Sequence, residues 1–180
     1  SNLDAKLRRQ VREDIREIQQ KLGVTTIYVT HDQEEALAIS DKVIVMNNAV
    51  IAQEGNPKDL YNFPKNKFVA NFIGDANVVR AEIINKQSNT YELKLAEINV
   101  KIECDNELNS SVSVALRPEK IEIKRSNDNN CIHATINNAS FVGSSYQYIL
   151  NSKLGKLYVI SNDTNDVFEV GENVVCSQMY

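Results

Sequence analysis

The stretch of residues 26–36 constrains the fold of this chain most, because it joins a β-forming run to a histidine and then to a helical pattern. Residues 24–30 are nearly continuous in β-branched and aromatic side chains, which is typical of a strand buried on both faces. His31 follows directly, and residues 32–40 have the apolar spacing of a helix. Because ligands of open α/β sheets bind beyond the carboxyl ends of the strands, His31 is a candidate for phosphate chemistry. A histidine at such a position can equally be a structural residue with a polar partner.

A helix is predicted before this stretch. Its apolar residues recur at spacings of four, four, three and four, which places them on one face: Leu7, Val11, Ile15, Ile18 and Leu22. Asp4 is a candidate N-cap, so the first residues are expected to form a loop. Gly23 is expected to end the helix in the left-handed conformation.

Two short strands, residues 42–46 and 50–53, are predicted on either side of a tight turn at Asn47-Asn48, since asparagine tolerates a positive φ. Short helices are predicted from Pro57 and over residues 67–73. After Gly74 the pattern changes to short β-forming runs separated by polar turns, which predicts a small barrel or sandwich. The expected strands are residues 77–84, 91–95, 99–103, 112–117, 121–124, 132–142, 146–150, 157–161 and 174–177.

Composition restricts the class of protein. The net charge of −4 disfavours a nucleic-acid binder, because such proteins concentrate Lys and Arg. Cys104, Cys131 and Cys176 stand far apart without a CxxC pair, so neither a zinc site nor a disulfide framework is expected, and free thiols suit a reducing cytoplasm. No apolar run approaches the roughly 18–20 residues that span a bilayer, and the charged start does not resemble a signal peptide. We therefore expect a soluble intracellular chain.

Three motifs, in order, resemble those of ABC-transporter ATPases. Residues 1–8, SNLDAKLR, resemble the D-loop and the helix after it, and residues 30–36, THDQEEA, resemble the switch-histidine loop. Residues 53–57, QEGNP, together with Leu60-Tyr61 and Pro64, resemble the closing elements of the nucleotide-binding domain. The spacing of one helix and one strand between the first two motifs also matches the family.

The second half carries a separate resemblance. Residues 115–121, ALRPEKI, resemble the RPE signature of the TOBE regulatory domain that follows the ATPase domain of ABC importers. Phe141-Val142-Gly143 fits a later turn of the same module, although any OB-like barrel could contain such a turn. Family members usually close this module with one further strand after residues 174–177, whereas this sequence stops at Tyr180, which leaves the closure of the barrel open.

Together the two resemblances imply the fold class. An α/β remnant of an ABC nucleotide-binding domain is expected over residues 1–75, and an all-β, OB-like (TOBE) regulatory domain over residues 76–180. A family member carries the Walker A, glutamine-loop, signature and Walker B motifs before the D-loop, and this sequence contains no G-x-x-x-x-G-K-[ST]. We therefore expect the carboxyl-terminal part of a longer ATPase that uses ATP and Mg²⁺. The ligands of both would lie outside this chain, no metal site is expected within it, and the chain alone would be inactive.

The resemblance also implies roles for individual residues. His31 would be catalytic, contacting the γ-phosphate and holding the attacking water in line. Ser1, Asn2, Leu3 and Asp4 would form the D-loop at the nucleotide and dimer interface, although Asp4 can also be a simple helix cap. Acidic residues in the first turn of a helix complement its dipole in any protein, so the residues after His31 are as consistent with a solvated surface.

The family further implies partners and a location. A homodimer would dock to integral-membrane permease subunits on the cytoplasmic face of the cell membrane, served indirectly by an extracytoplasmic substrate-binding protein and without nucleic acid. Residues 68–74 and Asn77 look most like the polyamine and ferric-iron branches, and a polyamine (spermidine or putrescine) is the substrate we favour. Ferric iron, sulfate, molybdate and sugars are the alternatives within the family.

Two other classes of protein are consistent with parts of the sequence. A stand-alone regulatory module could bind a small anion such as molybdate through its β half. A nucleic-acid-binding OB module would need basic residues interleaved with stacking aromatics, and Tyr146, Tyr148 and Tyr158 lack a basic surround.

Overall fold

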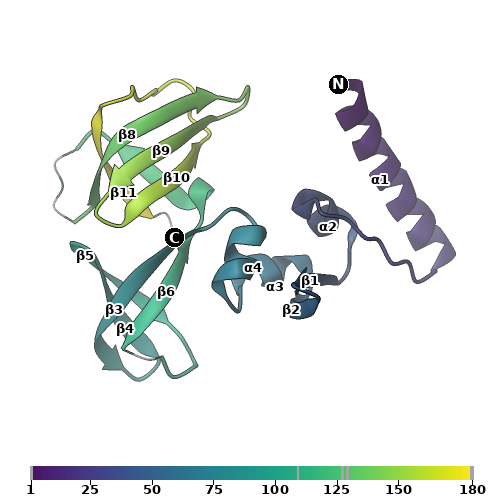
Figure 1. Ribbon diagram of the computed structural model, residues 1–180, viewed down its shortest axis with the longest axis horizontal. Coiled ribbons are helices and arrows are strands. Elements are labelled where there is room, and N and C mark those ends of the chain that lie inside the picture. Colours follow the sequence, from purple (N-terminus) through teal and green to yellow (C-terminus); the bar gives the residue numbers. More distant parts are fainter. Residues whose placement is uncertain (1, 109, 127, 129, 179–180) are drawn as a thin grey trace. The chain divides into compact units, whose positions relative to one another are not determined.

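The computed structural model describes residues 2–108, 110–126, 128 and 130–178, with side chains from Lys6 to Ser177 within these ranges. It divides into two compact units, Ser1–Gly74 and Asp75–Tyr180, which are treated separately below (Figure 1).

The first unit combines helices with one small antiparallel sheet. Its described elements, in chain order, are α1 (Asn2–Leu22), α2 (Gln33–Ile39), β1 (Val43–Asn47), β2 (Val50–Gly55), α3 (Pro57–Asn62) and α4 (Lys67–Phe72). Its core is a small cluster contributed by the sheet and the last two helices: Val43, Val45, Leu60, Val69 and Ile73. The four helices and two strands confirm the elements predicted for these segments.

The segment of residues 24–30 departs from the prediction. It is extended chain without strand pairing, and Ile27 and Val29 are 87% and 90% exposed. A strand buried on both faces needs neighbours that take up its backbone N–H and C=O groups, and none of the described strands pairs with this segment. The prediction of a buried strand was therefore wrong for this structure. A β-forming run indicates that a segment favours extended backbone, but a paired strand also requires partner strands.

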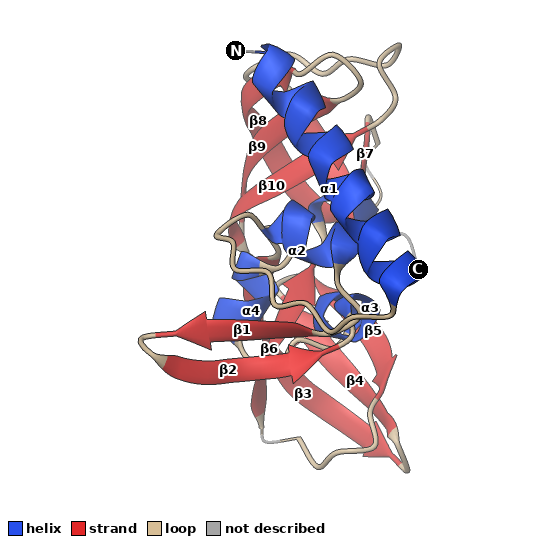
Figure 2. Ribbon diagram, turned by 90° about the vertical axis from the view of Figure 1, so that its right-hand side faces the viewer, coloured by secondary structure: helices blue, strands red, loops and turns tan. Residues whose placement is uncertain are grey.

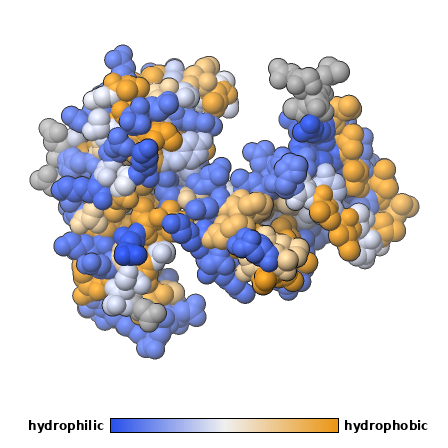
Figure 3. Space-filling model, in the orientation of Figure 1, coloured by the Kyte–Doolittle hydropathy of each residue, from blue (hydrophilic) through white to orange (hydrophobic). Residues whose placement is uncertain are grey.

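Helix α1 also differs in two respects from expectation. It already begins at Asn2, so Asp4 lies inside its first turn, and the prediction of Asp4 as N-cap was wrong. The predicted apolar stripe is largely exposed, with Leu7 at 60% and Leu22 at 68%, and Figure 3 shows apolar surface along this helix. Gly23 ends the helix with φ of 62°, which confirms the predicted left-handed end.

The β1–β2 hairpin, seen in Figure 2, has its turn at Asn48-Ala49, one residue later than predicted. Asn48 and Ala49 have φ of 50° and 62°, the pattern of a type I′ turn, which matches the twist of the flanking strands. In β2, the buried side chain of Gln53 donates to the carbonyl of Phe63 at 3.0 Å and accepts from the N–H of Lys65 at 2.7 Å. This side chain therefore fixes the loop between α3 and α4.

The second unit is all-β apart from the short 3₁₀ helix η1 (Pro118–Lys120). The described part contains two antiparallel sheets, with strand orders β5-β4-β3-β6 and β10-β9-β8-β11-β7. Each predicted strand is confirmed, with boundaries shifted by a few residues at most. The strands are β3 (Asn77–Gln87), β4 (Thr90–Leu95), β5 (Ile98–Glu103), β6 (Ser111–Leu116), β7 (Ile121–Lys124), β8 (Ile132–Phe141), β9 (Tyr146–Ser152), β10 (Gly155–Ser161) and β11 (Asn173–Gln178).

Both sheets of this unit contribute to one hydrophobic core. Leu93 of β4 and Leu150, Leu157 and Val159 of the other sheet are fully buried in the same cluster. Strand β11 lies between β8 and β7, so it occupies an interior position of its sheet, and the edges are β10 and β7. Among the described helices, none is long and apolar enough to cross a membrane.

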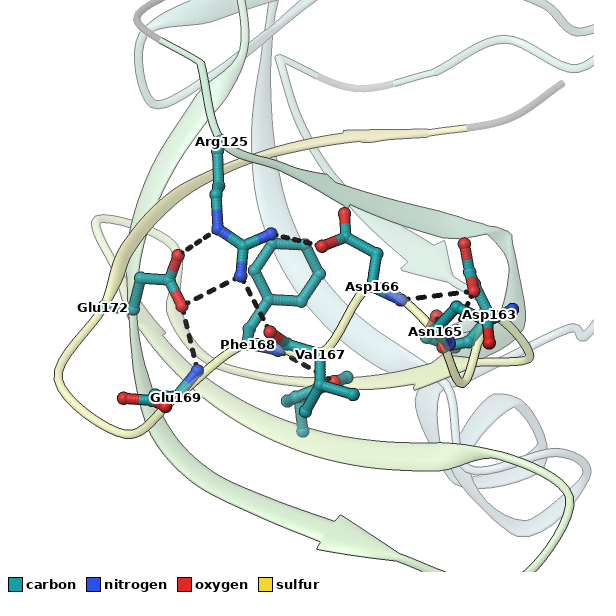
Figure 4. A network of polar contacts seen from close by, with 10 residues as sticks. Arg125, Asp163, Asn165, Asp166, Val167, Phe168, Glu169 and Glu172 are labelled. Carbon is teal, nitrogen blue, oxygen red and sulfur yellow. Dashed lines mark hydrogen bonds and ion pairs between the residues drawn. The ribbon is translucent and has the colours of Figure 1, made fainter.

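A polar network closes the long loop before β11 (Figure 4). Arg125 pairs with Asp166 and Glu172, and donates to the carbonyl of Val167 at 2.7 Å. Its guanidinium carbon lies 4.4 Å from the ring centroid of Phe168, which is almost fully buried. A charge that is both paired and stacked on an aromatic face anchors the loop to the core.

Candidate functional site

The loop that carries His31 is fixed at the start of α2 by a helix cap. Asp32 has extended backbone angles, and its Oδ1 accepts hydrogen bonds from the N–H groups of Glu34 and Glu35 at 2.8 and 3.2 Å. On the other side of His31, the hydroxyl of Thr30 accepts from the N–H of Asp32 at 3.0 Å. The first N–H groups of a helix lack partners within it, so this cap stabilises α2 and holds the backbone on both sides of His31.

Glu35 joins this loop to α1. Its carboxylate accepts hydrogen bonds from the hydroxyls of Thr30 at 2.8 Å and Tyr28 at 3.2 Å. It also pairs with Arg12 of α1 at 3.1 Å, and the side chains of Arg12 and Glu35 are only 19% and 13% exposed. Partial desolvation raises the pKa of Tyr28, and the adjacent charge of Glu35 raises it further. Sequence reasoning missed this role, because Arg12 belongs to α1 while Tyr28 and Thr30 belong to the extended segment.

His31 itself presents an exposed side chain from the bend before α2. No hydrogen bond or ion pair of its ring is found within the described ranges. An exposed imidazole can donate a hydrogen bond in either protonation state, which suits contact with an anionic ligand. The alternative of a structural histidine held by a polar partner has no support in these contacts.

The predicted D-loop residues come at the start of the chain, before the part of α1 that contacts the segment around His31. Ser1 falls outside the described residues, and Asn2, Leu3 and Asp4 belong to the first turn of α1, where no side chains are described. Arg12, which contacts α2, comes eight residues after Asp4, or about 12 Å along the helix axis. The described contacts thus join the middle of α1 to the segment around His31, and the predicted contacts of the D-loop side chains fall outside the described residues.

A small hollow of about 210 Å³ lies beside Glu35, between α1 and the extended segment. Its lining is Leu7, Arg8, Val11, Arg12, Tyr28 and Glu35. His31 does not line it. Within the described ranges, no group of three or more His, Cys, Asp and Glu side chains could hold a metal ion.

Gln33 forms a contact that the sequence did not predict. It is the first residue of α2, and its side-chain Oε1 accepts a hydrogen bond from the N–H of Gly74 at 2.6 Å. Gly74 follows the end of α4, 41 residues later in the chain. No local pattern signals such a pair, because both partners belong to different elements of the unit.

A family model for the TOBE domain matches residues 114–177, which agrees with the expected regulatory module. Among curated proteins, the chain is 39% identical over 160 residues to the Fe(3+) ions import ATP-binding protein FbpC of Brucella melitensis, covering 89% of this chain and 45% of that protein. The FbpC protein of Agrobacterium fabrum is 38% identical over 165 residues, covering 92% and 46%.

The spermidine/putrescine import ATP-binding protein PotA of Salmonella typhi is 37% identical over 172 residues, covering 92% of this chain and 46% of that protein. The chain therefore spans about half the length of the curated relatives it matches. Among solved structures, the cytoplasmic molybdate-binding protein ModG aligns with 57% of this chain and 89% of its own, at a TM-score of 0.45 and 8% identity.

Proposed function

We propose that this chain is part of an ABC importer ATP-binding subunit whose ATP hydrolysis drives import, because it is similar to such subunits and matches the TOBE domain model. The observation that carries this proposal is the alignment of about nine-tenths of the chain with such subunits. We further propose that residues 1–75 belong to the nucleotide-binding domain and residues 76–180 to the regulatory domain. The relatives are about twice as long, so hydrolysis is a property of the full-length subunit.

In this proposal His31 contacts the γ-phosphate of ATP. Phosphoryl transfer needs little covalent work from the protein, and catalysis consists of positioning and of stabilising charge on the equatorial oxygens. The exposed imidazole of His31 can donate a hydrogen bond to such an oxygen and help to orient the attacking water. Support comes from the Asp32 cap and the Glu35 contacts, which hold the backbone on both sides of His31 and leave its ring exposed.

Mg²⁺ would neutralise charge on the phosphates when ATP is bound. By the family resemblance, we propose that its ligands belong to the remainder of the full-length subunit. Ser1, Asn2, Leu3 and Asp4 would face the second copy in a homodimer. The dimer would sit on permease subunits at the cytoplasmic face of the membrane.

A polyamine is the substrate that we propose, from the likeness of residues 68–74 and Asn77 to that branch. Import of ferric iron is the second candidate, since relatives named for that function are 39% and 38% identical, against 37% for the relative named for spermidine and putrescine. No residue of this chain is expected to touch the substrate.

The test is steady-state ATP hydrolysis by the full-length subunit with its permease. We expect His31→Ala to lower the rate by roughly 10²–10³, because one positioning group for the transferred phosphoryl is lost, while ATP binding is retained. The control is His133→Ala, which changes the exposed histidine of β8 in the other unit. Unchanged hydrolysis in His31→Ala would make His31 structural. The favoured function would then be that of a stand-alone regulatory module. Its test is whether oxyanions raise the melting temperature of this chain.

A further inference from the structure

The chain is fixed on both sides of the boundary between its two units. On the first side, the N–H of Gly74 is held by the side-chain oxygen of Gln33 at 2.6 Å, directly after the buried Ile73. Gly74 and Asp75 have φ of 89° and 47°, so two successive residues adopt left-handed backbone angles. For Asp75 this conformation is uncommon, whereas glycine adopts it without a steric penalty.

On the second side, Asn77 is fixed to the β unit by its side-chain amide. Its Nδ2 donates to the carbonyl of Tyr158 at 2.7 Å, and its Oδ1 accepts from the N–H of Tyr158 at 2.6 Å. The amide thus pairs with the edge strand β10 as a peptide group would. Asn77 follows Gly74 by three positions, a reach of about 10 Å at most, so the joint consists of Gly74, Asp75 and Ala76.

The fixed point on the first side belongs to the His31 loop. Gln33 is two residues from His31 and follows the capping residue Asp32 directly. The side chain of Gln33 is half-buried, and its oxygen accepts from the N–H of Gly74, directly after the C-cap residue Ile73 of α4. Any rearrangement of the His31 loop that shifts the start of α2 therefore acts on the hydrogen bond that restrains Gly74.

We propose that Gln33 is a positioning residue that couples the His31 loop to the joint, so that nucleotide at His31 changes the torsional freedom of Gly74 and Asp75. This proposal rests on the proposed contact between His31 and ATP. When ATP orders the His31 loop, Gln33 holds Gly74 more firmly and the joint stiffens. When the loop is released, the hydrogen bond opens and the joint gains freedom.

The test is amide hydrogen exchange at residues 73–76 in the full-length subunit, with and without ATP and Mg²⁺. In the native protein, ATP is expected to slow exchange at Gly74. In Gln33→Met, which keeps the length of the side chain but has no acceptor oxygen, exchange is expected to be about two- to tenfold faster and insensitive to ATP. Gln33→Glu retains the oxygen and is expected to restore the ATP response. Glu34→Met, at the exposed neighbouring position, is the matched control.

Gln33→Asn gives a second, polar variant whose oxygen falls short of Gly74, and it is expected to behave like Gln33→Met. An ATP response at Gly74 that persists in both variants overturns the coupling, whatever the effect of His31→Ala on hydrolysis. If His31→Ala leaves hydrolysis unchanged while the rate of exchange at Gly74 still depends on Gln33, the proposed function of His31 fails. The role of Gln33 in holding Gly74 then stands. The two failures are thereby distinguished.

Discussion

Glu35 shows how much one side chain organises at the residue scale. It accepts from Thr30 and Tyr28 and pairs with Arg12, so it joins α1, the extended segment and α2 in a partly buried position. Without it, a largely buried guanidinium and two hydroxyls lose their acceptor. Groups left in this way cost more than the hydrogen bond contributed, because their desolvation is no longer compensated.

We therefore expect Glu35→Ala to lower the free energy of unfolding by about 1–3 kcal/mol. The measurement is chemical denaturation of the full-length subunit, monitored by a signal that reports on unfolding of the first unit. Glu34→Ala, at the exposed neighbouring position, is the control and is expected to change little. Equal denaturation midpoints for both variants would contradict the role given to Glu35.

At the scale of the element, one arginine outside the loop of residues 162–172 holds that loop in place. Residues 162–172 have no regular structure, yet Arg125 holds them at Asp166, Val167 and Glu172. The N–H of Glu169 donates to Glu172 at 2.9 Å, and this contact, followed by the guanidinium of Arg125, lowers the pKa of Glu172 below its ordinary value of 4.5. The carboxylate form is thus favoured in the folded loop.

The lowered pKa of Glu172 predicts how stability depends on pH. Its contribution is present above the ordinary pKa of 4.5 and is lost as pH falls through the lower folded value. Glu172→Gln should therefore lower the melting temperature at pH 7, and the difference from the native protein should shrink well below pH 4.5. Thermal unfolding at both pH values measures this, with Glu119→Gln, an exposed carboxylate of η1, as control. A difference that is independent of pH would contradict the account.

At the scale of the whole molecule, two separately built units meet at a three-residue joint. The first unit holds the candidate site, and the second contains the TOBE match. Under the proposed function, neither unit contains residues that we expect to select the imported substrate, so its identity has to be tested on the assembled transporter.

Uptake by cells that lack the full-length subunit tests the substrate. We expect labelled spermidine uptake to fall in such cells and to return when the native subunit is supplied, but not with His31→Ala. Ferric iron uptake, measured in the same cells, should change little. Loss of iron uptake with normal spermidine uptake would instead favour the second candidate.

The sequence by itself determined most of the local elements of this protein and the family that it resembles. Turn residues and period-two or helical spacing act over a few neighbours, so the strands from β3 to β11 and the helices were predicted within a few residues. The motif around His31 likewise gave the candidate residue, and its phosphate chemistry stays a prediction. In the same way, the left-handed end at Gly23 followed from the glycine itself.

Only the tertiary structure decided the contacts that position the site and the joint. Gln33 contacts Gly74, 41 residues later, and Asn77 pairs with Tyr158, 81 residues later. A periodic pattern predicts no contacts between residues so far apart in the sequence. Tertiary structure also decided the state of residues 24–30, whose strongly β-forming side chains remain unpaired with any described strand. Local preference is a property of neighbouring residues. Pairing and burial depend on which distant groups are present to satisfy the backbone.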